Sequence, residues 1–382
     1  MPRIFVIADN VVSPLGLTTA DNFNELIRNV TGIQEHTDIN MSESPFYAAL
    51  FNKGAVFIND ANPGYYTKFE QLLIASLYDA LKNTGIDPHD KKTVFILSST
   101  KGNISLLETA DDPALRKRAT LHESAKLVAE YFGFINKPLV VSNACISGSL
   151  AILTGMRLLH SGQYENAVIA GADTITKFVL SGFQAFQAIS NEPCKPFDRG
   201  RTGISLGEGA GTLVLSAHKK HEGKIQVSGG AVSNDANHIS GPSRTGQELA
   251  LVIDAALRQS NVSAAGIDFI SAHGTATLYN DEMEANAFTL EGLQTVPVNS
   301  LKGYFGHTLG ASGLIESIIS IHSLLENIVL PTRGFEQPGV SKPLNICSTL
   351  LRAPLRRCLK TASGFGGCNA AVIFSKPEGS LN

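Results

Sequence analysis

The stretch SNACISGS, residues 142–149, places Cys145 between a strand-like run and a helical pattern. The β-branched run Leu139–Val141 precedes it, and apolar residues at helical spacing follow from Leu150 to Leu159. This order predicts a strand, a tight turn and a helix, with Cys145 at the helix N-terminus, where backbone dipoles favour a thiolate. A thiolate at such a turn suits covalent catalysis. A buried structural cysteine is the alternative that this stretch alone leaves open.

Two histidines downstream stand in a common setting. His273 lies in SAHGTAT (residues 271–277) and His307 in NSLKGYFGHTLGASG (residues 299–313), and each follows a strand-like run. Side chains in glycine-rich turns after strands can point into a shared site. The two histidines together with Cys145 therefore favour a catalytic site over three unrelated structural residues.

The composition narrows the function classes. The 382 residues carry a net charge of −3, so the chain as a whole lacks the basic character that is typical of nucleic-acid-binding proteins. Hydrophobic residues make up 43% of the chain, which is enough for an extensive core. The apolar run Ile4–Ala8 is too short for a signal peptide or a membrane span. An odd number of cysteines without a C-x-x-C pair predicts a reduced, cytoplasmic protein: Cys145, Cys194, Cys347, Cys358 and Cys368.

Strand-like runs alternate with helical patterns along the whole chain, which predicts an α/β fold with largely buried strands. The polar stretch Ser216–Lys224 separates two similar halves, residues 1–220 and 221–382. The clearest helical patterns cover residues 70–83, 121–134, 150–159, 248–259 and 312–327.

In these motifs the chain resembles the β-ketoacyl synthases, the condensing enzymes of fatty acid and polyketide synthesis. The resemblance covers nearly the whole chain and includes the cysteine turn and both histidine motifs. It implies a thiolase-like fold of two pseudo-duplicated α/β halves in five layers (αβαβα), with the cysteine in the first half and both histidines in the second. The further matching motifs are VVSPLG (11–16), AGA (170–172), KPFDRGRTG (195–203), LGEGAG (206–211) and SGFGGCN (363–369).

The resemblance implies a β-ketoacyl-(acyl carrier protein) synthase, an acyltransferase that performs a decarboxylative Claisen condensation. Cys145 would hold the acyl group, and His273 and His307 would stabilise the enolate oxygen that forms when the malonyl thioester loses CO₂. The backbone N–H groups of Cys145 and Phe365 match the oxyanion hole. No metal and no cofactor are expected, because the substrates arrive on the phosphopantetheine arm of an acyl carrier protein.

Supporting positions follow from the same resemblance. Glu316 interrupts the apolar stretch Leu314–Ile319, so a buried, paired carboxylate is expected there. The other assignments are Lys302 as the active-site lysine, Asp281 and Glu284 as residues that orient the histidine loop, Thr275 and Thr277 as contacts to the pantetheine arm, and Phe183 as an aromatic residue of the pocket.

Three departures from the family pattern point to an unusual substrate. The sequence KGYFGH replaces K-S-x-T-G-H and brings Tyr304 and Phe305 near the histidine, where they are expected to form an aromatic wall of the acyl pocket. Lys101 aligns with the far end of the acyl pocket, and Gln187 stands where many relatives have an arginine that docks the carrier protein. These differences resemble the ketosynthases of aryl-polyene or flexirubin pigment clusters. The expected partners are therefore an acyl carrier protein and either a second copy or a chain-length-factor-like homologue.

Several alternatives remain at this point. The first is an ordinary homodimer for fatty-acid elongation. A non-catalytic chain-length subunit is disfavoured because such subunits lose the cysteine. A further alternative is a thiolase or a hydroxymethylglutaryl synthase. Thiolases keep a second catalytic cysteine near the C-terminus, but here Phe365 and Gly366 occupy the corresponding turn and Cys368 lies just beyond it. A Cys–His protease would give the second histidine and Lys302 no role, and a metal trio lacks the usual short ligand spacing.

Overall fold

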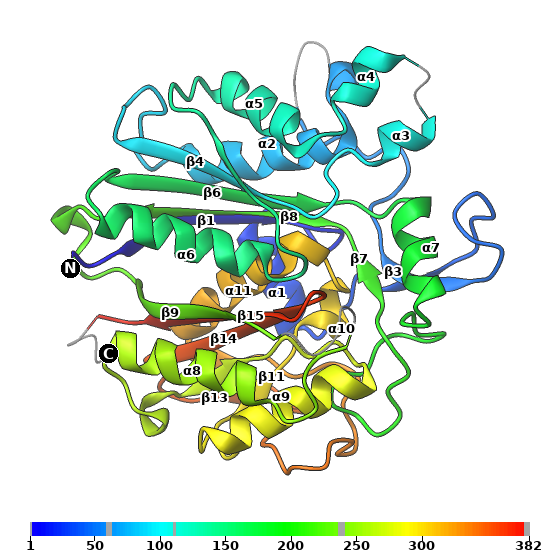
Figure 1. The fold of residues 1–382 in the computed structure, drawn as a ribbon, viewed down its shortest axis with the longest axis vertical. Coiled ribbons are helices and arrows are strands. Elements are labelled where there is room, and N and C mark those ends of the chain that lie inside the picture. The colour runs from blue at the N-terminus through cyan, green and yellow to red at the C-terminus, as the bar shows by residue number, and fades with distance from the viewer. Residues whose placement is uncertain (1, 59–62, 110–111, 236–240, 378–382) are drawn as a thin grey trace.

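One ten-stranded mixed sheet folds into two five-stranded parts, the first and second sheet, which lie face to face with helices between them and outside them (Figure 1). The computed structural model describes residues 2–58, 63–109, 112–235 and 241–377. The first sheet has the order β5 (Leu139–Val141), β4 (Thr93–Ser98), β6 (Asn166–Asp173), β8 (Gly209–Ser216) and β1 (Phe5–Val12). The second has the order β11 (Val298–Asn299), β10 (Phe269–Ser271), β14 (Arg357–Gly364), β15 (Cys368–Ser375) and β9 (Gln226–Asn234).

The two sheets have the same topology. Numbered along each half, the strands follow the spatial order 3-2-4-5-1 in both, with the first three neighbours parallel and the remaining contacts antiparallel. The two sheets are continuous where β1 pairs antiparallel with β9: the Val6 N–H donates to Ile225 O at 2.8 Å and the Val227 N–H donates to Ile4 O at 3.0 Å. The predicted α/β fold with two duplicated halves is therefore confirmed.

The five layers consist of two central helices between the two sheets and a layer of helices outside each sheet. Helices α6 (Ser147–His160) and α11 (Ser312–Glu326) lie between the sheets, with α2 (Lys68–Leu81) and α5 (Leu121–Phe132) outside the first sheet and α8 (Gln247–Ser260) and α9 (Leu278–Leu290) outside the second (Figure 1). α11 is buried on nearly all sides, since its sequence has apolar or small residues around the whole helix. The remaining elements are α1 (Thr19–Ile27), α3 (Ser105–Thr109), α4 (Pro113–Lys117), α7 (Lys177–Ala185), α10 (Lys302–Phe305), β2 (Gln34–His36), β3 (Phe46–Ala49), β7 (Leu206–Gly207), β12 (Ile328–Val329) and β13 (Leu351–Arg352).

Local capping sets the ends of the predicted helices. α2 begins at Lys68 because Thr67 and Glu70 form a capping box. α5 ends where Gly133 adopts φ 78°, and α11 ends where Asn327 adopts φ 56°. Among the described residues, no helix is both long enough and apolar enough to cross a bilayer.

Candidate active site

The turn before α6 presents Cys145 to the interior. Ala144 has φ 43°, a left-handed conformation that is costly for alanine and turns the chain sharply between β5 and the helix. Cys145 is 8% exposed. The turn after β14 lies against it, since a Cβ on Gly364 would be 2.9 Å from the Cys145 nitrogen. The two candidate oxyanion donors, Cys145 N–H and Phe365 N–H, therefore belong to adjoining turns.

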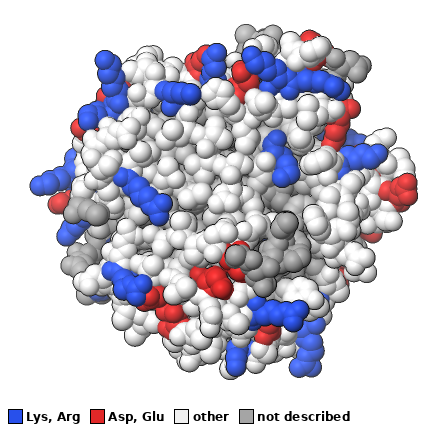
Figure 2. Space-filling view, in the orientation of Figure 1, with Lys and Arg blue, Asp and Glu red and all other residues white. Residues whose placement is uncertain are grey.

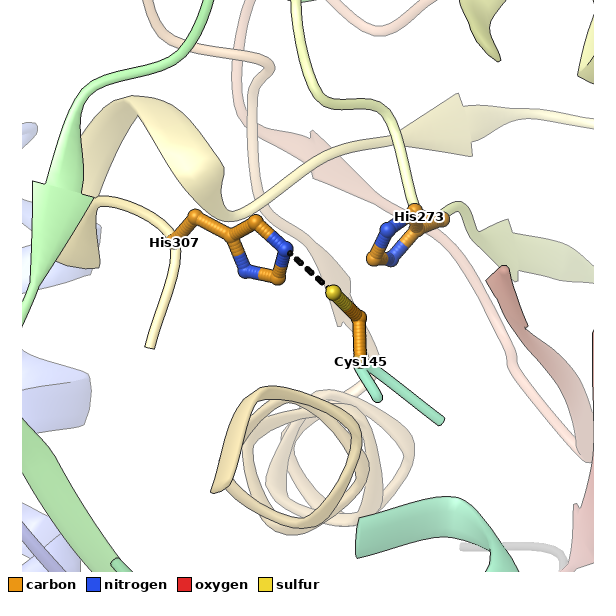
Figure 3. A group of neighbouring side chains, drawn as sticks. All are labelled: Cys145, His273 and His307. Carbon is orange, nitrogen blue, oxygen red and sulfur yellow. Dashed lines mark hydrogen bonds between the residues drawn. The ribbon is translucent and has the colours of Figure 1, made fainter. Parts of the chain in front are cut away.

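The two imidazoles lie on either side of the thiol (Figure 3). The distance from His307 Nε2 to Cys145 Sγ is 3.1 Å, and the rings of His273 and His307 are 5.2 Å apart at an interplanar angle of 81°. Each histidine is 3% exposed. Nδ1 of neither ring has a hydrogen-bond partner among the described residues, so no such contact fixes either tautomer.

Burial determines the resting protonation states. It raises the pKa of the Cys145 thiol to about 12. Burial, with the Lys302 ammonium second, lowers the pKa of His307 to about 3 and that of His273 well below its usual range. At neutral pH both groups are therefore neutral, and in the tautomer that carries its proton on Nδ1, His307 accepts from the thiol at Nε2. Burial opposes the thiolate that the helix N-terminus is expected to favour, so that expectation stays a prediction, and His307 is the adjacent base.

A buried ion pair between Lys302 and Glu316 contacts the backbone of His273. Lys302 Nζ pairs with Glu316 Oε1 and donates to His273 O at 3.0 Å. Ser312 Oγ donates to the same carboxylate oxygen at 2.9 Å. Although burial alone would raise the pKa of Glu316, the Lys302 and Lys360 ammonium groups lower it to about 2. The carboxylate therefore stays ionised, and Lys302 contacts the backbone of His273 rather than the cavity.

Two carboxylates on α9 bind the backbone of the His273 turn. Glu284 accepts from His273 N–H at 2.8 Å and from Gly274 N–H at 2.6 Å. Asp281 accepts from Thr275 N–H at 3.0 Å and from Phe197 N–H at 2.7 Å. These contacts orient the turn, and neither carboxylate is among the residues that line the cavity.

A cavity of about 970 Å³ opens onto the three reactive side chains. Thr275 and Thr277 line it, with their hydroxyl oxygens 3.0 Å apart. Phe183 and Phe186 on and after α7 also line it, and their ring centroids lie 5.8 and 5.6 Å from that of Phe365. The cavity thus joins a polar wall with an aromatic one at Cys145.

Two aromatic residues expected at the acyl pocket lie elsewhere. Tyr304 and Phe305 are 0% and 2% exposed and belong to the main hydrophobic core, and the Tyr304 hydroxyl donates to Asn29 Oδ1 at 2.9 Å. The prediction that they would wall the pocket is wrong, because helix α10 directs both side chains into the core. Lys101 is not among the residues that line this cavity, although it is partly exposed in the turn after β4.

The site also has the geometry of a possible ligand set. Cys145 Sγ and one nitrogen of each histidine all lie within 4.8 Å of one another. Thiolate and imidazole are ligands that zinc accepts. The same closeness brings a thiol within 3.1 Å of an imidazole nitrogen, which is the arrangement of a nucleophile beside its base. The geometry therefore supports nucleophilic chemistry more directly than a metal centre.

Comparisons with known proteins agree with this arrangement. The family description "Beta-ketoacyl synthase, N-terminal domain" matches residues 1–221, and "Beta-ketoacyl synthase, C-terminal domain" matches residues 225–336. The chain belongs to the β-ketoacyl synthase family. It is 28% identical over 414 aligned residues to the 3-oxoacyl-(acyl-carrier-protein) synthase 2 of Vibrio harveyi, with 98% of each chain covered.

Two solved structures are also similar. The structure described as the ishigamide ketosynthase/chain length factor has a TM-score of 0.90 and 25% identity, covering 98% of this chain and 99% of that chain. A ketosynthase in complex with its chain length factor from Xenorhabdus doucetiae has a TM-score of 0.88 and 24% identity, covering 98% of each chain. These comparisons confirm the thiolase-like fold. The chain is a β-ketoacyl-(acyl carrier protein) synthase, an acyltransferase of fatty acid or polyketide synthesis.

Within this β-ketoacyl synthase, Cys368 is not placed as a second catalytic thiol. It is 2% exposed, it is absent from the lining of the cavity, and its thiol points to Phe365 O at 3.5 Å and Asn143 O at 3.7 Å. The thiolase alternative therefore has no support from this turn.

The sequence reasoning missed two buried charged residues of this β-ketoacyl synthase. Asp173 ends β6 and accepts from Ser99 Oγ at 2.7 Å and from Gly310 N–H at 2.7 Å, so it ties the first half to the turn after His307. Lys360 on β14 forms an ion pair with Glu316 Oε2 at 2.6 Å. The available signal was a charged residue within a run that otherwise reads as a buried strand.

Proposed function

We propose that this β-ketoacyl synthase carries its acyl group on Cys145 and extends it with a malonyl unit, using His307 in both steps and His273 in the second. The observation that carries this proposal is the 3.1 Å contact between His307 Nε2 and Cys145 Sγ, which His273 does not share.

In the first step, Sγ attacks the acyl thioester and its proton passes to His307 Nε2. The N–H groups of Cys145 and Phe365 bind the tetrahedral oxyanion. The carrier thiolate leaves with the proton, so His307 is neutral again. Before the second step, proton exchange with solvent converts His307 to the tautomer that carries its proton on Nε2. The bond to the malonyl carboxylate then breaks, CO₂ leaves, and the electron pair forms an enolate whose oxygen accepts from the Nε2–H groups of both histidines. The enolate carbon attacks the acyl group, and Cys145 leaves as a thiolate that takes up a proton from water.

We further propose an unsaturated or aryl-primed polyene chain as the acyl substrate. Phe183, Phe186 and Phe365 offer aromatic faces at the cavity, and a flat, rigid chain gains about 0.5–1.5 kcal/mol from each good aromatic contact. The runner-up is elongation of saturated fatty acyl chains by a homodimer, which the full-length likeness to the Vibrio harveyi synthase favours.

The proposed partners are an acyl carrier protein and a second ketosynthase-like subunit. Edge strand β5 leaves Leu139 and Val140 37% and 36% exposed, and unpaired edges are covered by partners in many proteins. Figure 2 shows one face whose charged side chains lie mainly near the rim. The similar ishigamide structure includes a chain length factor, which supports a cysteine-free homologue as the second subunit. A cytoplasmic location stays a prediction.

The test compares conjugated and saturated acyl carriers of equal length, with malonyl carrier protein and the purified chain. The chain is assayed alone and with any cysteine-free ketosynthase homologue encoded by a neighbouring gene. We expect a higher kcat/KM for conjugated chains and a dimer by light scattering. An equal or higher kcat/KM for saturated chains with the chain alone would favour fatty-acid elongation instead.

A further inference from the structure

A second buried lysine contacts the same carboxylate as Lys302. Lys360 is 0% exposed, and its Nζ lies 2.6 Å from Glu316 Oε2, while Lys302 pairs with Oε1. The two oxygens of Glu316 therefore have one ammonium group each. A fully buried lysine is rare unless its charge is paired, so a second one beside an existing ion pair needs a reason.

The backbone contacts of the two lysines suggest that reason. Lys360 Nζ donates to Ser271 O at 3.2 Å and to Ala272 O at 3.1 Å, and Lys302 Nζ donates to His273 O at 3.0 Å. Three consecutive carbonyl groups that lead into the His273 turn thus bind ammonium groups anchored on Glu316. Strand pairing makes this possible, because Lys360 is in register with Ser271 in the parallel pair β10–β14.

The neighbouring residue on β14 holds the opposite side of the same turn. Thr361 Oγ1 donates to Glu284 Oε1 at 2.8 Å, and Glu284 accepts from the His273 and Gly274 N–H groups. Successive side chains of a strand point to opposite faces, so Lys360 reaches Glu316 on α11 while Thr361 reaches Glu284 on α9. The carbonyl groups and the N–H groups of the turn are therefore both fixed from β14.

We propose that Lys360 is a positioning residue for decarboxylation: together with Lys302 it holds the Ser271–His273 carbonyls and so fixes the imidazole of His273 at the site where the enolate oxygen forms. This inference rests on the proposed role of His273. The hydrogen bonds of Lys360 reach the backbone that leads into the His273 turn, whereas the Cys145 thiol contacts His307. Loss of Lys360 should therefore affect decarboxylation much more than acylation of Cys145.

The experiment measures the two half-reactions separately in Lys360→Met. Acylation of Cys145 is followed by intact-protein mass spectrometry, and decarboxylation by conversion of malonyl carrier protein to the acetyl form. We expect kcat for decarboxylation to fall about 10–100-fold while acylation stays within about threefold. Lys360→Arg, which keeps the charge, should recover part of the loss. Lys376→Met is the matched control, since Lys376 is a partly exposed lysine after β15 that donates to Asn327 Oδ1 at 2.8 Å.

A second variant covers the case in which Lys360→Met does not fold. Lys360→Gln keeps Lys302 and Glu316 as a balanced ion pair, can donate a hydrogen bond to the Glu316 oxygen that Lys360 leaves, and should show a selective loss of decarboxylation in the same direction. Wild-type decarboxylation by Lys360→Met, or an equal loss of both half-reactions, would overturn the positioning role. If the wild-type chain did not decarboxylate malonyl carrier protein, the proposed function itself would be overturned, and this inference with it.

Discussion

Corresponding turns in the two halves carry residues with different roles in the reaction. In each half the third strand leads into a turn whose residue before the functional side chain has positive φ, Ala144 at 43° before Cys145 and Gly306 at 67° before His307. In each half the second strand leads to a residue followed by a glycine with positive φ, Lys101 before Gly102 and His273 before Gly274. The duplicated topology therefore delivers Cys145, His273 and His307 to one cavity, whereas Lys101, the position that corresponds to His273, does not line it.

The surroundings of these corresponding positions differ. Cys145 follows an edge strand, and burial keeps it a neutral thiol. Buried charged residues bind the backbone of the His273 turn. Lys302 and Lys360, both paired with Glu316, lie on one side of this turn, and Glu284 lies on the other. The first half thus supplies an acyl carrier, and the second supplies a rigid polar framework. Rigid dipoles and charges are most useful where charge develops during the reaction, and this is the enolate step.

The largest expected effect separates the two halves. Cys145→Ala should abolish acyl transfer and condensation, a loss of more than about 10³-fold, because no other thiol lines the cavity among the described residues. Decarboxylation of malonyl carrier protein should persist, since it relies on the second half. Peptide mass spectrometry of the wild-type chain should find the acyl group, and a cerulenin-type alkylation, at Cys145. Labelling of Cys194 or Cys368 with Cys145 unmodified would sink the assignment.

The next largest effect separates the two histidines. His307→Ala should reduce both acylation of Cys145 and decarboxylation, by on the order of 10²–10³-fold, because it removes the base that contacts Sγ as well as an enolate donor. His273→Ala should reduce decarboxylation by a similar factor and leave most of the acylation rate. Single-turnover acylation and malonyl decarboxylation are measured for both variants. Equal acylation rates in the two variants would contradict the distinct role of His307.

The cysteine and histidine turns could be predicted because their evidence is local. A β-branched run, a turn and an apolar helical pattern lie within about one element of Cys145, and glycines mark both histidine turns. Fold class and the duplicated halves likewise follow from alternating patterns. The five layers came only with the family resemblance, since periodicity does not say which helix lies between two sheets.

The charged framework could not be predicted because its contacts are distant in sequence. The carbonyl partners of Lys360 are 88 and 89 residues away, and only the pairing of β10 with β14 brings them together. The prediction that Tyr304 and Phe305 line the acyl pocket was wrong for a related reason. Closeness to His307 along the chain does not give the direction of a side chain, and a short helix turned both into the core.

A pH profile tests whether burial or the helix N-terminus has the larger effect on the pKa of the Cys145 thiol. Because burial raises the pKa of Cys145 to about 12, its thiolate fraction should grow tenfold with each pH unit below that value. The rate of iodoacetamide alkylation at Cys145 should therefore increase about hundredfold from pH 7 to pH 9, whereas an ordinary thiol with a pKa of about 8.5 begins to level off there. Peptide mass spectrometry follows the reaction at Cys145 alone. A plateau below pH 8 would show that the helix N-terminus and the nearby lysines outweigh burial.

The smallest expected effect concerns the aromatic wall, which belongs to the first half except for Phe365. Phe186 is 59% exposed and lies 5.6 Å from the Phe365 ring in an edge-to-face arrangement, so Phe186→Ala should remove one aromatic contact with little cost to the fold. One such contact contributes about 0.5–1.5 kcal/mol, so the preference in kcat/KM for conjugated over saturated acyl carriers should fall about 2- to 13-fold. Phe178→Ala is the matched control, because Phe178 is 56% exposed on α7, the helix that Phe186 follows, and is not among the residues that line the cavity. The competition assay uses both carriers in one reaction, which cancels differences in enzyme concentration. If both variants kept the wild-type ratio, the aromatic wall would have no part in choosing the chain, and substrate choice would lie with the second subunit at the β5 edge.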